Sequence, residues 1–113
     1  MTRGANLGEF EIHVLAALER LGDDAYAVSV RDEIAARAGR RASIGAVYAT
    51  LGRLAEKGYV VFWFSDPLPV RGGRPRKHAR VTPAGRRALR SASQALARML
   101  DGLALGFTPG DGR

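Results

Sequence analysis

The sequence contains no cysteine, and this absence removes several classes of function at once. Without thiols the chain forms no disulfide, carries no cysteine nucleophile and offers no cysteine ligand to zinc. A cysteine-free chain also fits the reducing cytosol, where disulfides rarely persist. We therefore expect a cytoplasmic protein that folds without covalent cross-links.

Long apolar runs are absent as well. No stretch of about 18 or more apolar residues occurs, so we expect no membrane-spanning helix. Residues 1–4 include an arginine but lead into no apolar segment, and we expect no signal peptide. The basic residues do not collect on one amphipathic helix, which a membrane-surface protein would require.

Patterns that mark catalysis or metal binding are missing too. The only histidines, His13 and His78, are far apart, and no further histidine or carboxylate stands at the spacing of metal ligands. No nucleophile–base pair and no phosphate-cradling glycine loop is found. A metal-dependent nuclease needs clustered carboxylates, and residues 37–98 contain only Glu56 and Asp66. We predict a protein that is not an enzyme and that binds no metal or other cofactor.

Positive charge, by contrast, is abundant and unevenly placed. The 113-residue chain has a formal net charge of +7. Residues 1–36 hold three arginines and seven acidic side chains, whereas residues 37–98 hold fourteen basic and two acidic side chains. A stretch this basic favours a polyanionic partner, with nucleic acid as the leading candidate. The length allows one small domain, and a domain of this size gains from burying surface against a partner subunit.

Residues 43–58 carry the strongest pattern for nucleic-acid recognition. Ser43 stands at the N-cap position of a predicted helix, and Gly58 stands where its C-terminal cap belongs. Apolar residues between them recur at helical spacing and predict one buried stripe, namely Ile44, Val47, Leu51 and Leu54.

The opposite face of this predicted helix is small and basic. Small side chains let a helix approach a DNA groove closely, and arginine reaches base edges or phosphates. An ordinary amphipathic helix with a solvated face is the alternative interpretation. From this helix and the arginine-containing turn before it, the predicted DNA contacts are Arg41, Ser43, Gly45, Ala46, Ala49, Arg53 and Lys57.

Two more helices are predicted upstream, over residues 7–21 and 27–38. The second ends at Gly39, and the short turn and capped helix that follow complete a helix-turn-helix. The first helix has apolar residues on more than one face. We expect its main stripe in the core and a second surface against another subunit, formed by Ile12, Leu15 and Ala16.

A β-hairpin is predicted directly after the helix-turn-helix. Residues 59–65 are dense in β-branched and aromatic side chains, and residues 78–81 read as the returning strand. The loop between them combines two glycines with basic residues, which suits a wing that contacts phosphates or a minor groove. A flexible solvated loop is the alternative. The predicted wing contacts are Arg71, Gly72, Gly73, Arg74, Arg76 and Lys77.

A final helix is predicted over residues 82–105, followed by a disordered tail over residues 106–113. Thr82 is a suitable N-cap, and Pro83 suits the first helical position. The apolar residues of this helix recur as in a short coiled coil, although the same stripe could pack on the chain's own domain. We predict a dimer seam formed by Leu89, Ala92, Leu96, Met99, Leu100 and Leu103.

In order and spacing, five segments resemble PadR-family transcriptional regulators, namely residues 7–15, 43–54, 57–60, 73–77 and 81–89. The resemblance implies a mainly α fold with a small β-wing, that is, a winged helix-turn-helix followed by a C-terminal dimerisation helix. It also implies a homodimer joined through the first and last helices, repression of promoters with paired half-sites, and a phosphate contact for Tyr48. The short last helix resembles a subfamily in which some members bind drug-like aromatic ligands at the dimer interface. Because this helix has no Trp or Tyr, the question of a small-molecule effector stays open.

These inferences combine into one hypothesis. Residues 1–81 form a DNA-binding domain, and residues 82–105 form a dimerisation helix. The homodimer is expected to bind double-stranded DNA in a sequence-specific way and to regulate transcription, with repression as its effect. The alternative is a winged-helix interaction module whose basic face binds an acidic protein.

Overall fold

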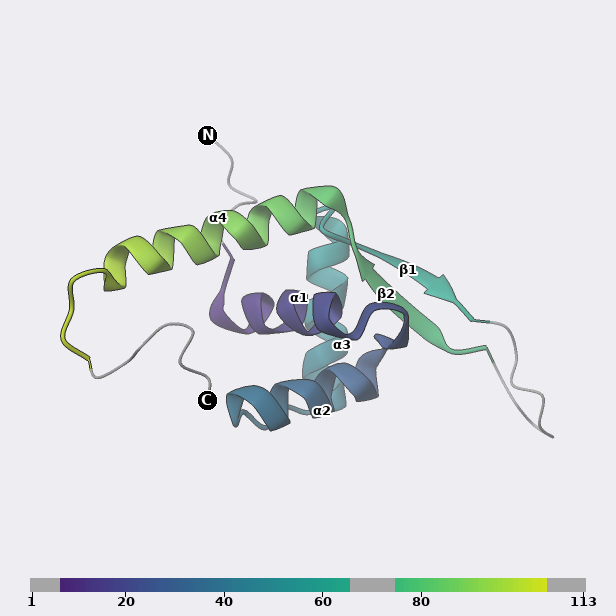
Figure 1. Cartoon of the computed structure of the whole chain (residues 1–113). Helices are drawn as coiled ribbons and strands as arrows, with labels where there is room; N and C mark the ends of the chain where they lie inside the picture. The colour runs from purple at the N-terminus through teal and green to yellow at the C-terminus, as the bar shows by residue number, and fades with distance from the viewer. Residues whose placement is uncertain (1–6, 66–74, 106–113) are drawn as a thin grey trace.

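Helices dominate the chain, and an antiparallel hairpin projects from them (Figure 1). The structure, a computed structural model, describes residues 7–65 and 75–105. The mainly α fold with a small β-hairpin that the sequence predicts is confirmed. In chain order the elements are α1 (Glu9–Leu21), the short 3₁₀ turn η2 (Gly22–Asp24), α2 (Ala27–Ala38), α3 (Ile44–Glu56), β1 (Val60–Phe64), β2 (Lys77–Val81) and α4 (Pro83–Leu100).

Capping residues set the two ends of α3. The Ser43 hydroxyl accepts a hydrogen bond from the N–H of Ala46 at 3.0 Å, which confirms Ser43 as the N-cap. At the other end Gly58 adopts a φ of +80°, a conformation that glycine reaches without steric cost. The chain then turns back, and the N–H of Tyr59 donates to the carbonyl of Leu54 at 2.9 Å.

The core lies where α1 and α2 cross α3, and it extends beneath the base of the hairpin (Figure 1). One prediction is wrong here. The sequence places Leu15 on a surface that faces another subunit, whereas the structure buries this side chain completely. The reason is that α1 contacts α2, α3, α4 and β2, so several of its faces are interior. The largest fully buried side chains are Leu15, Leu51, Leu54, Val14, Val30, Val47 and Thr50.

The middle of β2 is anchored to the segment that precedes α2. The two strands pair antiparallel along their full length, and the N–H of Ala79 in β2 donates to the carbonyl of Ala25 at 3.0 Å. The His78 ring stacks on Trp63, with 4.2 Å between ring centroids, and meets the Tyr26 ring edge-on at 5.9 Å. These contacts fix the direction in which the hairpin leaves the helices.

One joint connects the end of α3, the start of β1 and the start of α4. The Thr82 hydroxyl donates to the carbonyl of Gly58 at 2.7 Å, and the Thr82 N–H donates to the carbonyl of Tyr59 at 3.0 Å. The same hydroxyl accepts from the N–H of Gly85 at 3.0 Å and so caps α4. The structure therefore confirms Thr82 as an N-cap and ties α4 directly to the end of α3.

α4 rests on the rest of the chain through its first turns alone. Gly85 and Ala88 are buried, and the guanidinium of Arg86 forms an ion pair with Glu19 on α1. From residue 93 onward the helix is exposed, and Figure 1 shows its far half extending beyond the other helices. The first turns of α4 thus belong to the same packed unit as the winged helix-turn-helix.

The end of α4 comes earlier than the sequence predicts. The coiled-coil pattern continues to Leu103, but the helix ends at Leu100. Asp101 leaves the helical conformation with a ψ of 133°, and Gly102 follows with a φ of +81°. Both residue types disfavour a helix interior, so Leu103 lies in the segment beyond the helix.

Replacing Gly85 with alanine is expected to destabilise the protein by about 1–3 kcal/mol. A Cβ at this position would overlap the carbonyl oxygen of Tyr59, a backbone atom that cannot move without disturbing the joint. Urea unfolding measures the change in the free energy of unfolding. Gly52→Ala on α3 is the matched control, because a Cβ there meets nothing within 4 Å and alanine favours a helix. Equal stability of the two variants would contradict the close contact.

Candidate nucleic-acid interface

The first two turns of α3 present small side chains to solvent. Gly45, Ala46 and Ala49 are all exposed, as the sequence predicts, while the other side of the helix is buried in the core. Tyr48 stands beside them and is 48% exposed. A flat or grooved partner can therefore approach the backbone of α3 closely on this face.

A nearly buried carboxylate, that of Glu11 on α1, lies beside the end of α3. Glu11 is 8% exposed, and its two oxygens accept hydrogen bonds from the ammonium of Lys57 at 3.0 and 2.9 Å. The Nε of Arg53 lies 4.0 Å from the same carboxylate. The sequence places Lys57 among the DNA contacts, whereas the structure directs its charge to Glu11. A contact between Lys57 and DNA stays a prediction.

The pKa of Glu11 reflects opposing influences. Burial by itself raises the pKa, but the hydrogen bonds from Lys57 and from the N–H of Gly8, with the positive charges of Lys57 and Arg53, outweigh it. Together they hold the pKa below its ordinary value of 4.5. A carboxylate whose pKa is lower in the folded chain stabilises the fold at pH values above its unfolded pKa. This stabilisation is lost as the pH falls through the folded pKa.

Glu11→Gln is expected to weaken the acid dependence of stability. Near neutral pH the variant should be less stable than the wild type, because the ion pair with Lys57 is gone. At about pH 3, which is below the unfolded pKa, the difference should shrink, because unfolding of the wild type is then favoured by proton uptake at Glu11. Urea unfolding of both proteins at the two pH values measures the gap. If the two proteins differ in stability by the same amount at both pH values, the result would contradict a stabilising role for the charged form of Glu11.

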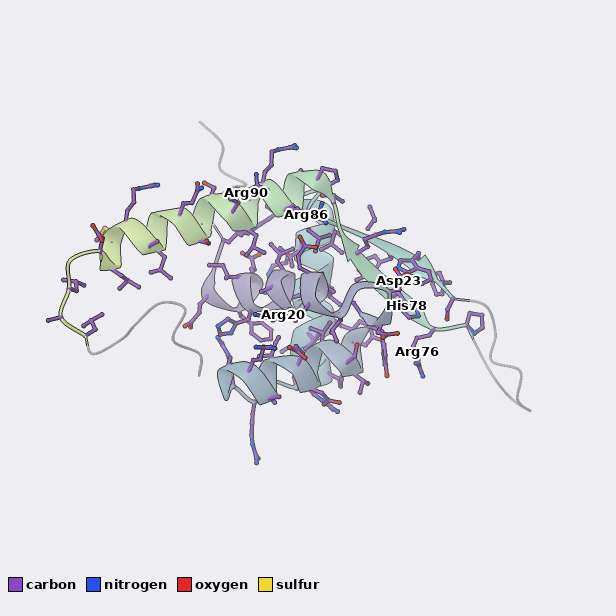
Figure 2. All side chains as sticks on the ribbon, viewed as in Figure 1. Arg20, Asp23, Arg76, His78, Arg86 and Arg90 are labelled. Carbon is purple, nitrogen blue, oxygen red and sulfur yellow. The ribbon has the colours of Figure 1, made fainter. Side chains whose placement is uncertain are left out.

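Two cations of the hairpin lie on aromatic rings. The guanidinium of Arg76 sits 4.2 Å above the Tyr26 ring, and the ammonium of Lys77 sits 4.2 Å above the Phe62 ring. Both side chains are exposed, and Figure 2 shows Arg76 near His78 on the hairpin. Stacking of this kind orients a cation and leaves its outer side free for a partner. The predicted wing residues Arg71, Gly72, Gly73 and Arg74, and the predicted tail, lie outside the described residues.

Ion pairs divide the basic residues into two groups. Besides the contacts of Arg53 and Lys57 with Glu11, four pairs join an arginine to a carboxylate in the described chain, namely Arg31–Asp32, Arg37–Glu33, Arg40–Glu9 and Arg86–Glu19. Within residues 7–65 and 75–105, Arg41, Arg76 and Lys77 form no ion pair. The first of these precedes α3 and the other two lie on the hairpin that follows it, so positive charge is available on both sides of α3 along the chain.

The residues predicted for the dimer seam differ in exposure. Met99 is 76% exposed and Leu96 is 56% exposed, on the part of α4 that extends from the body. Leu100 and Leu103 are also exposed, as is Leu105, which the sequence did not single out. Leu15 is buried in the core, as described above. The other residues predicted for the dimer contact are half-buried, namely Ile12, Ala16, Leu89 and Ala92.

Neither a metal site nor a membrane span is found in the described parts of the chain. Over those ranges, no group of three or more His, Asp or Glu side chains could hold a metal ion. None of the helices that the structure describes is both long and apolar enough to cross a bilayer.

Comparison with known proteins identifies the family. The sequence profile of the "Transcriptional regulator PadR-like family" matches residues 14–91, which run from α1 to the middle of α4. No curated protein matches the sequence significantly. The match includes every element that forms the candidate interface.

Several solved structures share the fold. A PadR family transcription regulator from Clostridium difficile superposes with a TM-score of 0.68 at 22% identity, over 83% of this chain and 96% of that one. A PadR family transcriptional regulator from Eggerthella lenta gives 0.63 at 26% identity, over 79% and 75%. Bacillus subtilis PadR, solved in complex with operator DNA, gives 0.59 at 13% identity, over 84% and 61%. With the profile match, these likenesses make the fold a winged helix-turn-helix, and the chain belongs to the PadR-like family of transcriptional regulators, whose members are not enzymes.

Proposed function

We propose that the protein is a sequence-specific regulator that binds double-stranded DNA as a homodimer and represses transcription. The observation that carries the proposal is the open, small-residue face of α3, preceded and followed along the chain by cations that form no ion pair with the described residues. A helix of this kind can enter the major groove, where base edges differ in their hydrogen-bonding pattern. Family membership and the operator complex of Bacillus subtilis PadR support the same role.

Each group of residues has a part in this proposal. Gly45, Ala46 and Ala49 allow close approach to base edges, and the two alanines can meet thymine methyl groups. Contacts with the phosphate backbone at the edges of the groove are assigned to Tyr48 and Ser43. Ionic contacts with phosphates along the groove are assigned to Arg41, Arg76, Lys77 and the wing residues Arg71 and Arg74. Gly72 and Gly73 are assigned a close approach of the wing backbone to DNA.

The homodimer is supported by the uncovered apolar side chains near the end of α4. Leu96, Met99 and Leu100 share one side of the helix and are exposed in the single chain. Leu96 and Leu100, together with Leu103 and Leu105, line an open apolar hollow. Apolar side chains at this spacing fit a second copy of the same helix, because a two-fold contact buries the same stripe on both subunits.

Gel retardation with random duplex DNA at low salt tests DNA binding directly. The proposal expects a shift, because phosphate contacts hold any duplex at low ionic strength. The competing function is a module whose basic face binds an acidic protein. That function is favoured if the duplex is not retarded while a purified acidic protein co-migrates with the chain.

Repression, as distinct from activation, needs a promoter assay. A reporter placed behind the preferred binding sequence should show lower expression when the wild-type protein is present. A rise in expression would contradict repression, but it would not contradict DNA binding.

A further inference from the structure

Arg53 differs from the other basic residues of the interface because two nearly buried polar groups hold it. Its Nη2 donates to the hydroxyl of Thr50 at 2.9 Å, and Thr50 is 1% exposed. Its Nε lies 4.0 Å from the carboxylate of Glu11. Even so, 56% of the Arg53 side chain is exposed, and its position four residues after Ala49 places it on the open face of α3.

We propose that Arg53 reads a guanine edge in the major groove and that Thr50 and Glu11 are its positioning residues. The inference rests on the proposed function. A guanidinium donates two parallel hydrogen bonds to O6 and N7 of guanine, and this pairing needs the guanidinium in one orientation. Thr50 uses one Nη2 proton, so the other Nη2 proton and both Nη1 protons remain for a base.

Contact with phosphate alone is the competing role, and the surroundings of Arg53 argue against it. A phosphate accepts a cation from many directions, so a phosphate contact gains little from a fixed guanidinium. The nearby Glu11 carboxylate also repels phosphate and weakens the local positive potential. The cations of Arg76 and Lys77, by contrast, rest on aromatic rings and have no carboxylate partner in the described chain.

Lys57 completes the arrangement by fixing the carboxylate itself. Its ammonium bonds to both oxygens of Glu11, and the N–H of Gly8 donates to one of them at 2.8 Å. The carboxylate is therefore held in place before any ligand arrives. Orientation that is already present in the free protein lowers the entropy lost on binding and sharpens discrimination between bases.

The test compares selected and random DNA. Selection from a pool of random duplexes with the wild-type protein first identifies the preferred sequence and its guanines. Affinity for that sequence divided by affinity for random duplex then gives a specificity ratio for each variant. A variant that is partly unfolded loses affinity for both duplexes alike, so the ratio separates base reading from folding.

Arg53→Lys keeps the charge and removes the planar donor pair. Its specificity ratio is expected to fall by about 5- to 150-fold, the range that one bidentate contact to guanine supplies. Its affinity for random duplex and the salt dependence of that affinity should stay near wild type. Repeating the selection with the variant should give a degenerate base where the wild type selects guanine.

Thr50→Val and Thr50→Ser form a matched pair for the positioning role. Serine keeps the hydroxyl that accepts from Arg53 and should keep the ratio, whereas valine removes it and should lower the ratio. Adding Arg53→Lys to Thr50→Val should lower the ratio no further than Arg53→Lys alone. Glu11→Gln should also lower the specificity ratio. If its ratio equals that of the wild type, Glu11 is not a positioning residue.

Two kinds of failure are distinguishable. If Arg53→Lys keeps the wild-type ratio, or Arg53→Ala weakens selected and random DNA equally with a smaller salt dependence, Arg53 contacts phosphate and the inference is overturned. If the wild-type protein enriches no sequence at all, sequence-specific binding itself fails, and the inference fails with it.

Discussion

Operator affinity falls on the order of 10³–10⁵-fold between 50 and 200 mM salt if the dimer neutralises roughly 6–10 phosphates. Each phosphate that pairs with a cation releases condensed counterions, and added salt opposes that release. The cations that supply such contacts are those without carboxylate partners in the described chain, such as Arg41, Arg76 and Lys77 in each protomer. The number of phosphates neutralised sets the slope of log affinity against log salt.

Arg76→Ala locates this charge on the hairpin. Because a dimer loses two contacts, the slope should become shallower by about 2, with selected and random DNA affected alike. Arg90→Ala is the control, because Arg90 is exposed on α4 (Figure 2) and is assigned no DNA contact. A wild-type affinity that barely responds to salt would remove the electrostatic basis of the proposal. If the salt dependence of Arg76→Ala has the same slope as that of the wild type, the hairpin is not part of the DNA interface.

Leu96→Glu is expected to separate the proposed homodimer into monomers and to abolish operator binding at concentrations where the wild type is bound. Leu96 lies in the middle of the apolar stripe near the end of α4, and two-fold symmetry places its substitute against the partner's stripe. Burying an unpaired carboxylate there costs several kcal/mol, which a seam of this length cannot offset. Without the seam each monomer holds a single half-site, and its affinity falls steeply.

Light scattering measures the outcome. The mass of the variant should equal that of one chain, 12.1 kDa, while the wild type should give twice that value. Arg98→Glu is the matched control, because it places the same new carboxylate on the charged side of α4 and should leave the dimer intact. Circular dichroism checks that both variants keep their helices. A dimeric Leu96→Glu protein would place the subunit contact elsewhere.

Local patterns predicted most of the fold. Ser43 and Thr82 are short hydroxyl side chains that stand before apolar stripes, and each caps its helix as expected. The dense aromatic run after Gly58 forms β1, and the hairpin follows. Such predictions succeed because they depend on neighbours in sequence, which set backbone geometry directly.

Predictions that depend on distant partners were weaker. Leu15 was assigned to a second surface because periodicity alone cannot show that α1 is covered on several sides. The ion pair between Lys57 and Glu11 could not be predicted, because the two residues are 46 positions apart in sequence. Thr50 and Glu11 were not singled out at all, because a threonine on a helix and a glutamate in a first turn are both ordinary in sequence.

Because α4 is attached at its base through Thr82, a small tilt at the base produces a larger displacement at its far end. The hydrogen bonds of Thr82 to Gly58 and Tyr59 attach the base of α4 to the end of α3, the helix proposed to face DNA. An 18-residue helix is about 27 Å long, so a tilt of about 10° at its base displaces the far end by about 5 Å. In the proposed homodimer, which those far ends would hold together, a small change in angle at the joint would change the spacing of the operator half-sites that the two chains can reach.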